Sequence, residues 1–127
     1  MTPPLRLAAF FFAALGATVA TAQDLTGPQK NALRSAKSYL EMTGFSRDGL
    51  IDQLSSAYGE GYDLADATVA VDSLSVDWNA EATEAAMQYI EMTGFSCNGL
   101  IEQLSSDYGN KFTRAQAAFG AEAAGAC

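Results

Sequence analysis

Residues 39–59 of the chain read YLEMTGFSRDGLIDQLSSAYG, and residues 89–109 read YIEMTGFSCNGLIEQLSSDYG. Sixteen of these 21 positions are identical, and the offset between the two stretches is fifty residues throughout. Chance does not produce such agreement, so the chain contains an internal duplication. Two copies are too few for a solenoid and indicate a pair of small modules in tandem.

Each copy has the pattern of three helices. In the first copy, apolar residues recur at helical spacing over 28–42, with Pro28 in the first turn and Gly44 just past the end. Ser46 is expected to cap a second helix whose apolar stripe is Leu50, Ile51, Leu54 and Tyr58, ending at Gly59. Asp63 is expected to cap a third helix with a buried stripe of Leu64, Ala67, Val71 and Leu74.

The second copy repeats these signals. Asn79 is expected to cap its first helix and Ser96 its second, and Thr113 with Gln116 predicts a capping box for its third. No period-two run is long enough for a strand. The predicted fold is all-α, with two tandem three-helix helix-turn-helix modules at 28–77 and 78–127, joined at Val76-Asp77-Trp78.

The N-terminus is typical of a secretory signal peptide. Arg6 precedes a 13-residue apolar run, and Ala20-Thr21-Ala22 offers small residues for cleavage before Gln23. The alternative is a membrane anchor, but the run is shorter than the roughly 20 residues that a spanning helix needs. Residues 1–22 are therefore predicted to be removed, leaving an exported periplasmic or secreted protein without stable membrane insertion. Because no cysteine lies near the cleavage site, we expect no lipid anchor.

Composition excludes several classes of function. Among 127 residues there is no His, which argues against Ser-His-Asp hydrolases and most zinc enzymes. The formal net charge is −8, and both halves of the chain are acidic, so neither offers a basic face for phosphate contacts. Carboxylates such as Asp52 and Glu102 resemble a solvated helix face rather than a catalytic pair. We expect no enzyme activity, no cofactor and no metal site.

Large side chains and glycines recur at fixed places in the two copies. Four aromatic residues near helix starts could form a ligand platform, but a 50-residue module needs such side chains in its core; they are Phe45, Phe95, Tyr62 and Phe112. Trp78 is expected to wedge between the modules. Gly49 and Gly99 fall inside the second helices, where they suggest a close helix–helix approach, although a functional role is an alternative.

The two cysteines are interpreted through the repeat. Cys97 aligns with Arg47, and Cys127 aligns with Asp77, so two cysteines stand where the first copy has an opposite-charge pair. The alignment predicts a Cys97–Cys127 disulfide in an oxidising compartment and an Arg47–Asp77 ion pair. A reactive thiol or a redox pair is the alternative, but there is no CxxC motif and no nearby base.

The repeated block resembles the repeat of the Ltp family, the host cell surface-exposed lipoproteins of bacteria and their phages. The first copy carries it at Ala32, Ala36, Tyr39, Phe45, Ser46, Gly49, Leu50, Ile51, Gln53, Leu54, Tyr58 and Gly59. The second carries it at the positions fifty residues later, and Lys111-Phe112-Thr113 continues the match, whereas Gly61-Tyr62-Asp63 departs from it. The resemblance implies tandem helix-turn-helix modules outside the cytoplasm and, for phage-encoded members, superinfection exclusion through the DNA injection machinery. The missing lipoprotein cysteine is a departure from the family.

The favoured function is non-catalytic binding of a protein or peptide outside the cytoplasm, and the alternative is a helix-turn-helix DNA-binding protein. Charge and export both argue against nucleic acid as the partner. Polar residues on the repeated second helices are the candidate partner-binding residues: Gln53, Ser55, Ser56, Gln103, Ser105 and Ser106. The alternative role for these residues is to cap helix ends and satisfy backbone groups.

Overall fold

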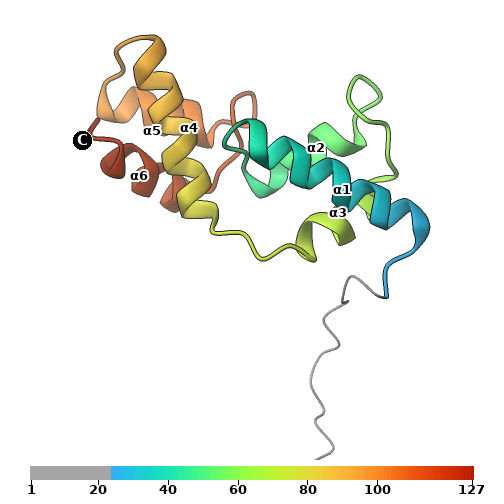
Figure 1. The fold of residues 1–127 in the computed structure, drawn as a ribbon. Helices are drawn as coiled ribbons and strands as arrows, with labels where there is room; N and C mark the ends of the chain where they lie inside the picture. The colour runs from blue at the N-terminus through green and yellow to red at the C-terminus, as the bar shows by residue number, and fades with distance from the viewer. Residues whose placement is uncertain (1–23) are drawn as a thin grey trace, which may run out of the picture.

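The computed structural model describes residues 24–127, and the predicted signal peptide lies outside the described residues. Six helices follow one another, and the described part of the chain contains no strand (Figure 1). The helices are α1 (Gly27–Met42), α2 (Arg47–Ser55), α3 (Leu64–Asp72), α4 (Trp78–Met92), α5 (Cys97–Ser105) and α6 (Arg114–Ala123). The predicted all-α class and tandem repeat are confirmed.

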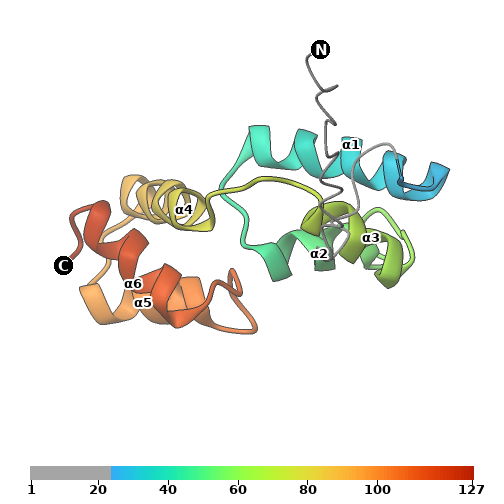
Figure 2. The same ribbon diagram turned by 90° about the horizontal axis from the view of Figure 1, so that it is seen from below.

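The helices form two groups of three that lie side by side. Within the first group α1 packs against α2 and α3, and within the second α4 packs against α5 and α6. Figure 2 shows that α1 and α4 lie on one side of the molecule, with the shorter helices on the other. The chain passes from one group to the other through residues 73–77.

Side chains at the helix starts explain where the helices begin. Ser46 and Ser96 each accept a hydrogen bond from the backbone N–H three residues later, at 2.9 Å, as predicted for N-caps. The capping box of Thr113 and Gln116 is also present. The prediction for Asn79 is wrong, because Asp77 caps α4 by accepting from the N–H groups of residues 79 and 80.

Each group has its own apolar core. The first core contains Leu50, Leu54 and Val71, with Phe45, Tyr62 and Leu74 packed at its edge. The second core combines small residues with three large ones, namely Ala82, Ala85, Ala86, Ala117, Ala121, Leu100, Leu104 and Phe112. Trp78, the first residue of α4, packs against the first core and so ties the junction to the first group. The four aromatic residues expected in the cores all pack there.

Several side chains lie where periodicity did not place them. The second helix ends at Ser55, so Tyr58 lies beyond it and is fully exposed instead of completing the apolar stripe. Leu64, at the start of α3, is also exposed. Asp63 stands at the cap position of α3, but its side chain makes no capping hydrogen bond.

The two copies fasten the third helix differently. Cys97 and Cys127 form a disulfide, with their Cα atoms 4.7 Å apart. The predicted Arg47–Asp77 ion pair is wrong, because Arg47 makes a bidentate pair with Asp72, at 2.7 and 2.9 Å. The reason is that α3 ends at Asp72 and the chain then leaves for the second group. After α6, by contrast, the chain turns back at Gly125, where φ is +86°.

A cleft between the two repeats

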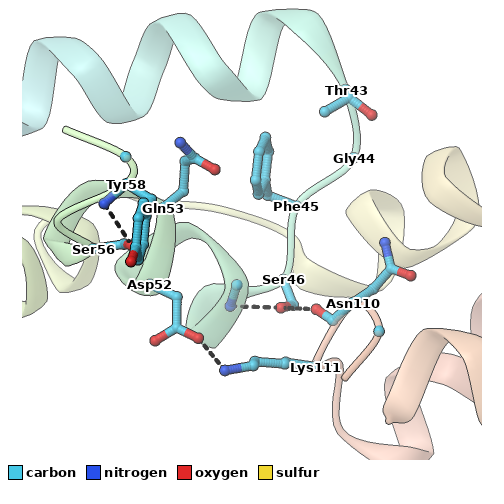
Figure 3. Close-up of a pocket in the computed structure, with 13 residues that line it drawn as sticks. Thr43, Gly44, Phe45, Ser46, Asp52, Gln53, Ser56, Tyr58, Asn110 and Lys111 are labelled. Carbon is cyan, nitrogen blue, oxygen red and sulfur yellow. Dashed lines mark hydrogen bonds and ion pairs between the residues drawn. The ribbon is translucent and has the colours of Figure 1, made fainter. Parts of the chain in front are cut away.

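A cleft of about 500 Å³ lies where the two groups of helices meet (Figure 3). One wall comes from the first repeat, through the α1–α2 turn, the exposed side of α2 and the loop that follows it. The other wall is a short loop of the second repeat, residues 109–111. The lining residues from the first repeat include Phe45, Ser46, Asp52, Gln53, Ser56 and Tyr58. Although the sequence is duplicated, this cleft is made jointly by both copies.

Ser46 joins the walls at the bottom of the cleft. Its hydroxyl caps α2 and also donates a hydrogen bond to the backbone oxygen of Asn110. Ser46 is buried as a result, whereas the equivalent Ser96 caps α5 in the same way and remains exposed. Among residues 24–127, no loop therefore lies over Ser96, and the second repeat lacks this wall of the cleft.

Lys111 closes one end of the cleft by pairing with Asp52 across the repeats. The hydrogen bond with the Asp52 carboxylate raises the pKa of Lys111 above its ordinary value. Lys111 has φ +61°, a left-handed conformation that is strained for a side chain with a Cβ, and the equivalent Gly61 has φ +70°. The second repeat thus has a lysine at a left-handed backbone position, whereas the first repeat has glycine, which adopts this conformation without strain.

Gly49 has a different role from the one predicted. A Cβ at this position would lie 2.8 Å from Ser46 Oγ and 3.0 Å from the backbone oxygen of Asn110. At Gly99 a Cβ would likewise lie 2.8 Å from Ser96 Oγ. The glycines thus leave room for the capping hydroxyls, and the predicted close helix–helix approach is wrong.

The six candidate partner-binding residues are distributed over two repeats, and the cleft brings together only Gln53 and Ser56. Gln53 donates to the Tyr39 hydroxyl, and Gln103 donates to the Tyr89 hydroxyl. Ser105 donates to the backbone oxygen of Ile101. Ser55 and Ser105 are half-buried at the ends of their helices.

Ser56 and Ser106 shape the loop that follows each second helix. Each hydroxyl accepts from the backbone N–H two residues later, at 3.1 Å in both copies. Their backbone oxygens accept two further N–H groups from the loop. These contacts are the ones expected for the alternative role, in which the serines satisfy backbone groups.

The same loops present Tyr58, which helical periodicity placed on the apolar stripe of the second helix, and its counterpart Tyr108. Tyr58 and Tyr108 have relative exposures of 101% and 102%. The glycine after each tyrosine lies against the backbone oxygen of Gln53 or Gln103, where a Cβ would clash. Tyr-Gly after a pair of serines, present in both copies, is a turn signal that competes with the helical period. That signal could have placed both tyrosines outside the helices.

The chemistry of the cleft suits binding. Among residues 24–127, nothing accepts from the Asn110 amide N–H groups or donates to the Gln53 amide oxygen, so both are open to a ligand. The Tyr58 ring stands at the rim (Figure 3). In the same part of the chain, no group of three or more Cys, Asp or Glu side chains is placed to hold a metal ion.

A pair of three-helix modules with a shared polar cleft defines a small all-α tandem-repeat protein. The family model for the host cell surface-exposed lipoproteins matches residues 28–74 and again 77–123. The chain therefore belongs to the Ltp family. Among solved structures it is similar to Ltp, a superinfection exclusion protein from the Streptococcus thermophilus temperate phage TP-J34, at 28% identity and a TM-score of 0.69.

The similarity to that phage protein covers 77% of this chain and 96% of the other. No curated protein sequence matches the chain. Within residues 24–127, none of the helices has the length and apolar character needed to cross a membrane.

Proposed function

We propose that this Ltp-family protein is a non-catalytic exported module that binds a protein or peptide partner outside the cytoplasm. The observation that supports this proposal is a pair of loops with the same backbone hydrogen bonds, which hold Tyr58 and Tyr108 fully exposed. Tyrosine supplies a large, amphipathic contact surface with few rotatable bonds, and it is enriched at binding hot spots. Core packing gives no reason for two exposed tyrosines.

The face around these loops fits a protein partner better than nucleic acid. Asp48, Asp52 and Asp107 lie near Lys111, so the only lysine beside the cleft is already neutralised. Phosphate binding needs several unpaired cations on one face. The related phage protein is a superinfection exclusion protein, which makes a component of the phage DNA injection machinery a candidate partner.

Partner capture from the extracytoplasmic fraction tests this proposal. The double variant Tyr58→Ser with Tyr108→Ser should lose captured protein by about tenfold or more, because two hot-spot tyrosines cost at least about 1 kcal/mol each. Leu64→Ser is the matched control, since Leu64 is an exposed apolar residue of the first repeat and Arg114 occupies its equivalent position. Equal capture by wild type and the double variant would contradict the assignment of this face as the binding surface.

A second arm of the experiment addresses exclusion. Cells that export the wild-type protein should admit less phage DNA after adsorption than cells that export the double tyrosine variant. Normal adsorption in both strains is the control. If DNA entry is unchanged while capture succeeds, the chain is a binding module with a different biological role.

A further inference from the structure

A second kind of hollow occurs once in each repeat, at equivalent positions. The hollow on the first repeat, of about 400 Å³, is lined by Ser35, Ser38, Tyr39, Met42 and Glu60. The hollow on the second, of about 250 Å³, is lined by Ala85, Gln88, Tyr89, Met92 and Asn110, together with Thr43 from the first repeat. Every residue of the first set is matched by the residue fifty positions later. We call them the first and second hollows.

The wall of each hollow is a tyrosine held in a fixed position. Tyr39 donates to Glu60 Oε1 at 2.6 Å and accepts from Gln53, and its ring packs edge-on against Phe45 at 5.6 Å between centroids. Tyr89 has the same arrangement. It donates to Asn110 Oδ1 at 2.8 Å, accepts from Gln103 and packs against Phe95 at 5.5 Å. Both hollows are thus preformed, which lowers the entropic cost of filling them.

A methionine stands exposed at each hollow. Met42 and Met92 have relative exposures of 72% and 78%, although they end the first helix of each repeat, where polar residues would serve equally well. Methionine is flexible and polarisable, so it adapts to apolar side chains of a partner. Its recurrence at the same place has no explanation in the core of either repeat.

The two hollows differ in charge and size. Glu60 lines the first hollow, and its carboxylate raises the pKa of Tyr39 through their hydrogen bond. The neutral Asn110 replaces it in the second. Thr43 donates to Gln88 at 2.6 Å beside the second hollow, so a residue of the first repeat narrows it.

We propose that the two hollows are paired anchor sites for one protein segment that presents two apolar side chains, with a basic residue beside the one that enters the first hollow. The inference rests on the proposed function and names the chemistry of its partner. The only charged lining residue is Glu60, which favours a cation at the first hollow alone. Two anchor sites on one chain bind a segment more tightly than either site does alone, because the second contact forms within the complex made by the first.

Residues 23–127 offer a direct test through their three methionines, Met42, Met87 and Met92. Met87 lies half-exposed on α4 and lines neither hollow, so it is an internal control. With ¹³C-methyl-labelled methionine, N-acetyl-leucinamide should shift the Met42 and Met92 signals saturably and leave the Met87 signal in place. Equal or non-saturating shifts at all three methionines would overturn the proposal.

Charge preference distinguishes the first hollow from the second. An acetylated Leu-Arg amide should bind at Met42 about two- to fivefold more tightly than the Leu-Glu amide, the range for one exposed charge pair, and the two should bind equally at Met92. Glu60→Gln keeps an acceptor for Tyr39 and should abolish the preference at Met42. A preference that survives Glu60→Gln, or that is equal at both hollows, contradicts the charge assignment.

Other occupants would give different results. Saturable shifts with N-acetylglucosamine but not with N-acetyl-leucinamide would make the hollows glycan sites. A concentration-dependent dimer that shifts Met42 and Met92 without any probe would make the occupant a second copy of the chain. Either result would overturn the assignment to a partner segment.

The capture experiment separates failure of this inference from failure of the proposed function. Met42→Ser with Met92→Ser should reduce capture by about tenfold, and Met87→Ser should not. If a partner is captured and both variants behave like wild type, the hollows are not the anchors although the function stands. If no protein is captured by the wild type, the proposed function fails, whatever the probes show.

Discussion

Gly44 and Gly94 occupy equivalent positions but meet opposite surroundings. A Cβ on Gly44 would lie 2.5 Å from the backbone oxygen of Glu81 and 2.7 Å from the backbone N of Ala85, both on α4. A Cβ on Gly94 would meet nothing within 4 Å. Neither glycine has a positive φ, so Gly44 is required by the close approach of the repeats rather than by a helix end.

We expect Gly44→Ala to lower the free energy of unfolding by about 1–3 kcal/mol, because a backbone clash cannot be relieved by a rotamer change. Gly94→Ala should be neutral or slightly stabilising. Urea unfolding of the two variants checks this, with small-angle scattering to detect separation of the repeats. Similar losses in both variants would show that the approach of α4 to Gly44 does not stabilise the protein.

Glu81 is the carboxylate placed between the repeats, where Oε2 accepts from the N–H of Phe45 at 3.1 Å. Burial raises its pKa, the Phe45 hydrogen bond lowers it, and the charge of Glu84 raises it, with a net increase from 4.5. The folded state therefore binds this proton more tightly than the unfolded state does. The resulting stabilisation is fully present below the unfolded pKa and is lost as pH rises through the folded pKa.

We expect Glu81→Gln to raise the free energy of unfolding at pH 7 by less than about 1 kcal/mol, since partial exposure screens the charge. The amide keeps an oxygen that accepts from Phe45. The difference from wild type should shrink as pH falls through and below 4.5, because the wild-type carboxyl takes up its proton over this range. Urea unfolding at both pH values measures it, and Glu91→Gln, at an exposed position of the same helix, is the control. A difference that grows on acidification would contradict the assigned pKa shift.

At the residue scale, three of the five predicted helix caps are correct, whereas Asn79 does not cap α4 and Asp63 makes no capping hydrogen bond. Ser46, Ser96 and Thr113 cap helices as expected because a cap depends only on the next three residues. Tyr58 was misplaced because its spacing continues the stripe of Leu50 and Leu54, while the turn at Ser56 ends the helix first. No local sequence pattern predicts that Asn110 covers Ser46, because 64 residues separate them.

The third helices differ in how closely they pack. A Cβ on Gly120 would lie 2.6 Å from the backbone of Ala82, so α6 approaches α4 more closely than a residue with a side chain would permit. The first repeat has Ala70 at the position of Gly120. Packing by small residues buries less apolar area, and the disulfide at the end of α6 compensates for that loss.

We expect Cys97→Ser with Cys127→Ser to lower the free energy of unfolding by about 2–4 kcal/mol, the range for closing a loop of this length. Hydrogen exchange should show that α6 and α5 lose protection before α1–α3. The comparison variant is Arg47→Ala, which removes the ion pair that links α2 to α3 in the first repeat. Its cost should be about 1 kcal/mol or less, because Arg47 and Asp72 are both substantially exposed.

Equal losses of the free energy of unfolding in the cysteine and Arg47 variants would mean that the disulfide stabilises its repeat no more than the ion pair does.

The alignment of the copies predicted this disulfide but gave the wrong partner for Arg47. Sequence equivalence held along the helices, and it failed where the chain paths diverge after Asp72 and Glu122.

For the whole molecule, the relation between the repeats is head to tail. The loop at 110–111 of the second repeat lies on the start of α2 in the first, through Ser46 and Asp52. The start of α5 presents the same features, with an exposed Ser96 and with Glu102 in place of Asp52. In geometric terms it could receive the loop of another repeat.

The residues that would make that contact are Glu60 and Gly61, the counterparts of Asn110 and Lys111. Glu60 would bring a carboxylate toward Glu102, and Gly61 offers no cation in place of Lys111. Glu102 is also paired with Arg114 at 2.8 Å. Like charges at a contact cost free energy, so the first repeat is poorly suited to cover the second repeat of a neighbour.

The exposed cap at Ser96 is thus a surface on which the loop of another molecule could stack, and Glu60 and Gly61 disfavour that contact. A contact that joins unlike surfaces without closing a ring propagates indefinitely. We expect Glu60→Asn with Gly61→Lys to produce concentration-dependent head-to-tail polymers, visible by sedimentation velocity, and the further change Glu102→Lys to dissolve them. If the double variant sediments like wild type at every concentration, charge at this loop does not control head-to-tail association.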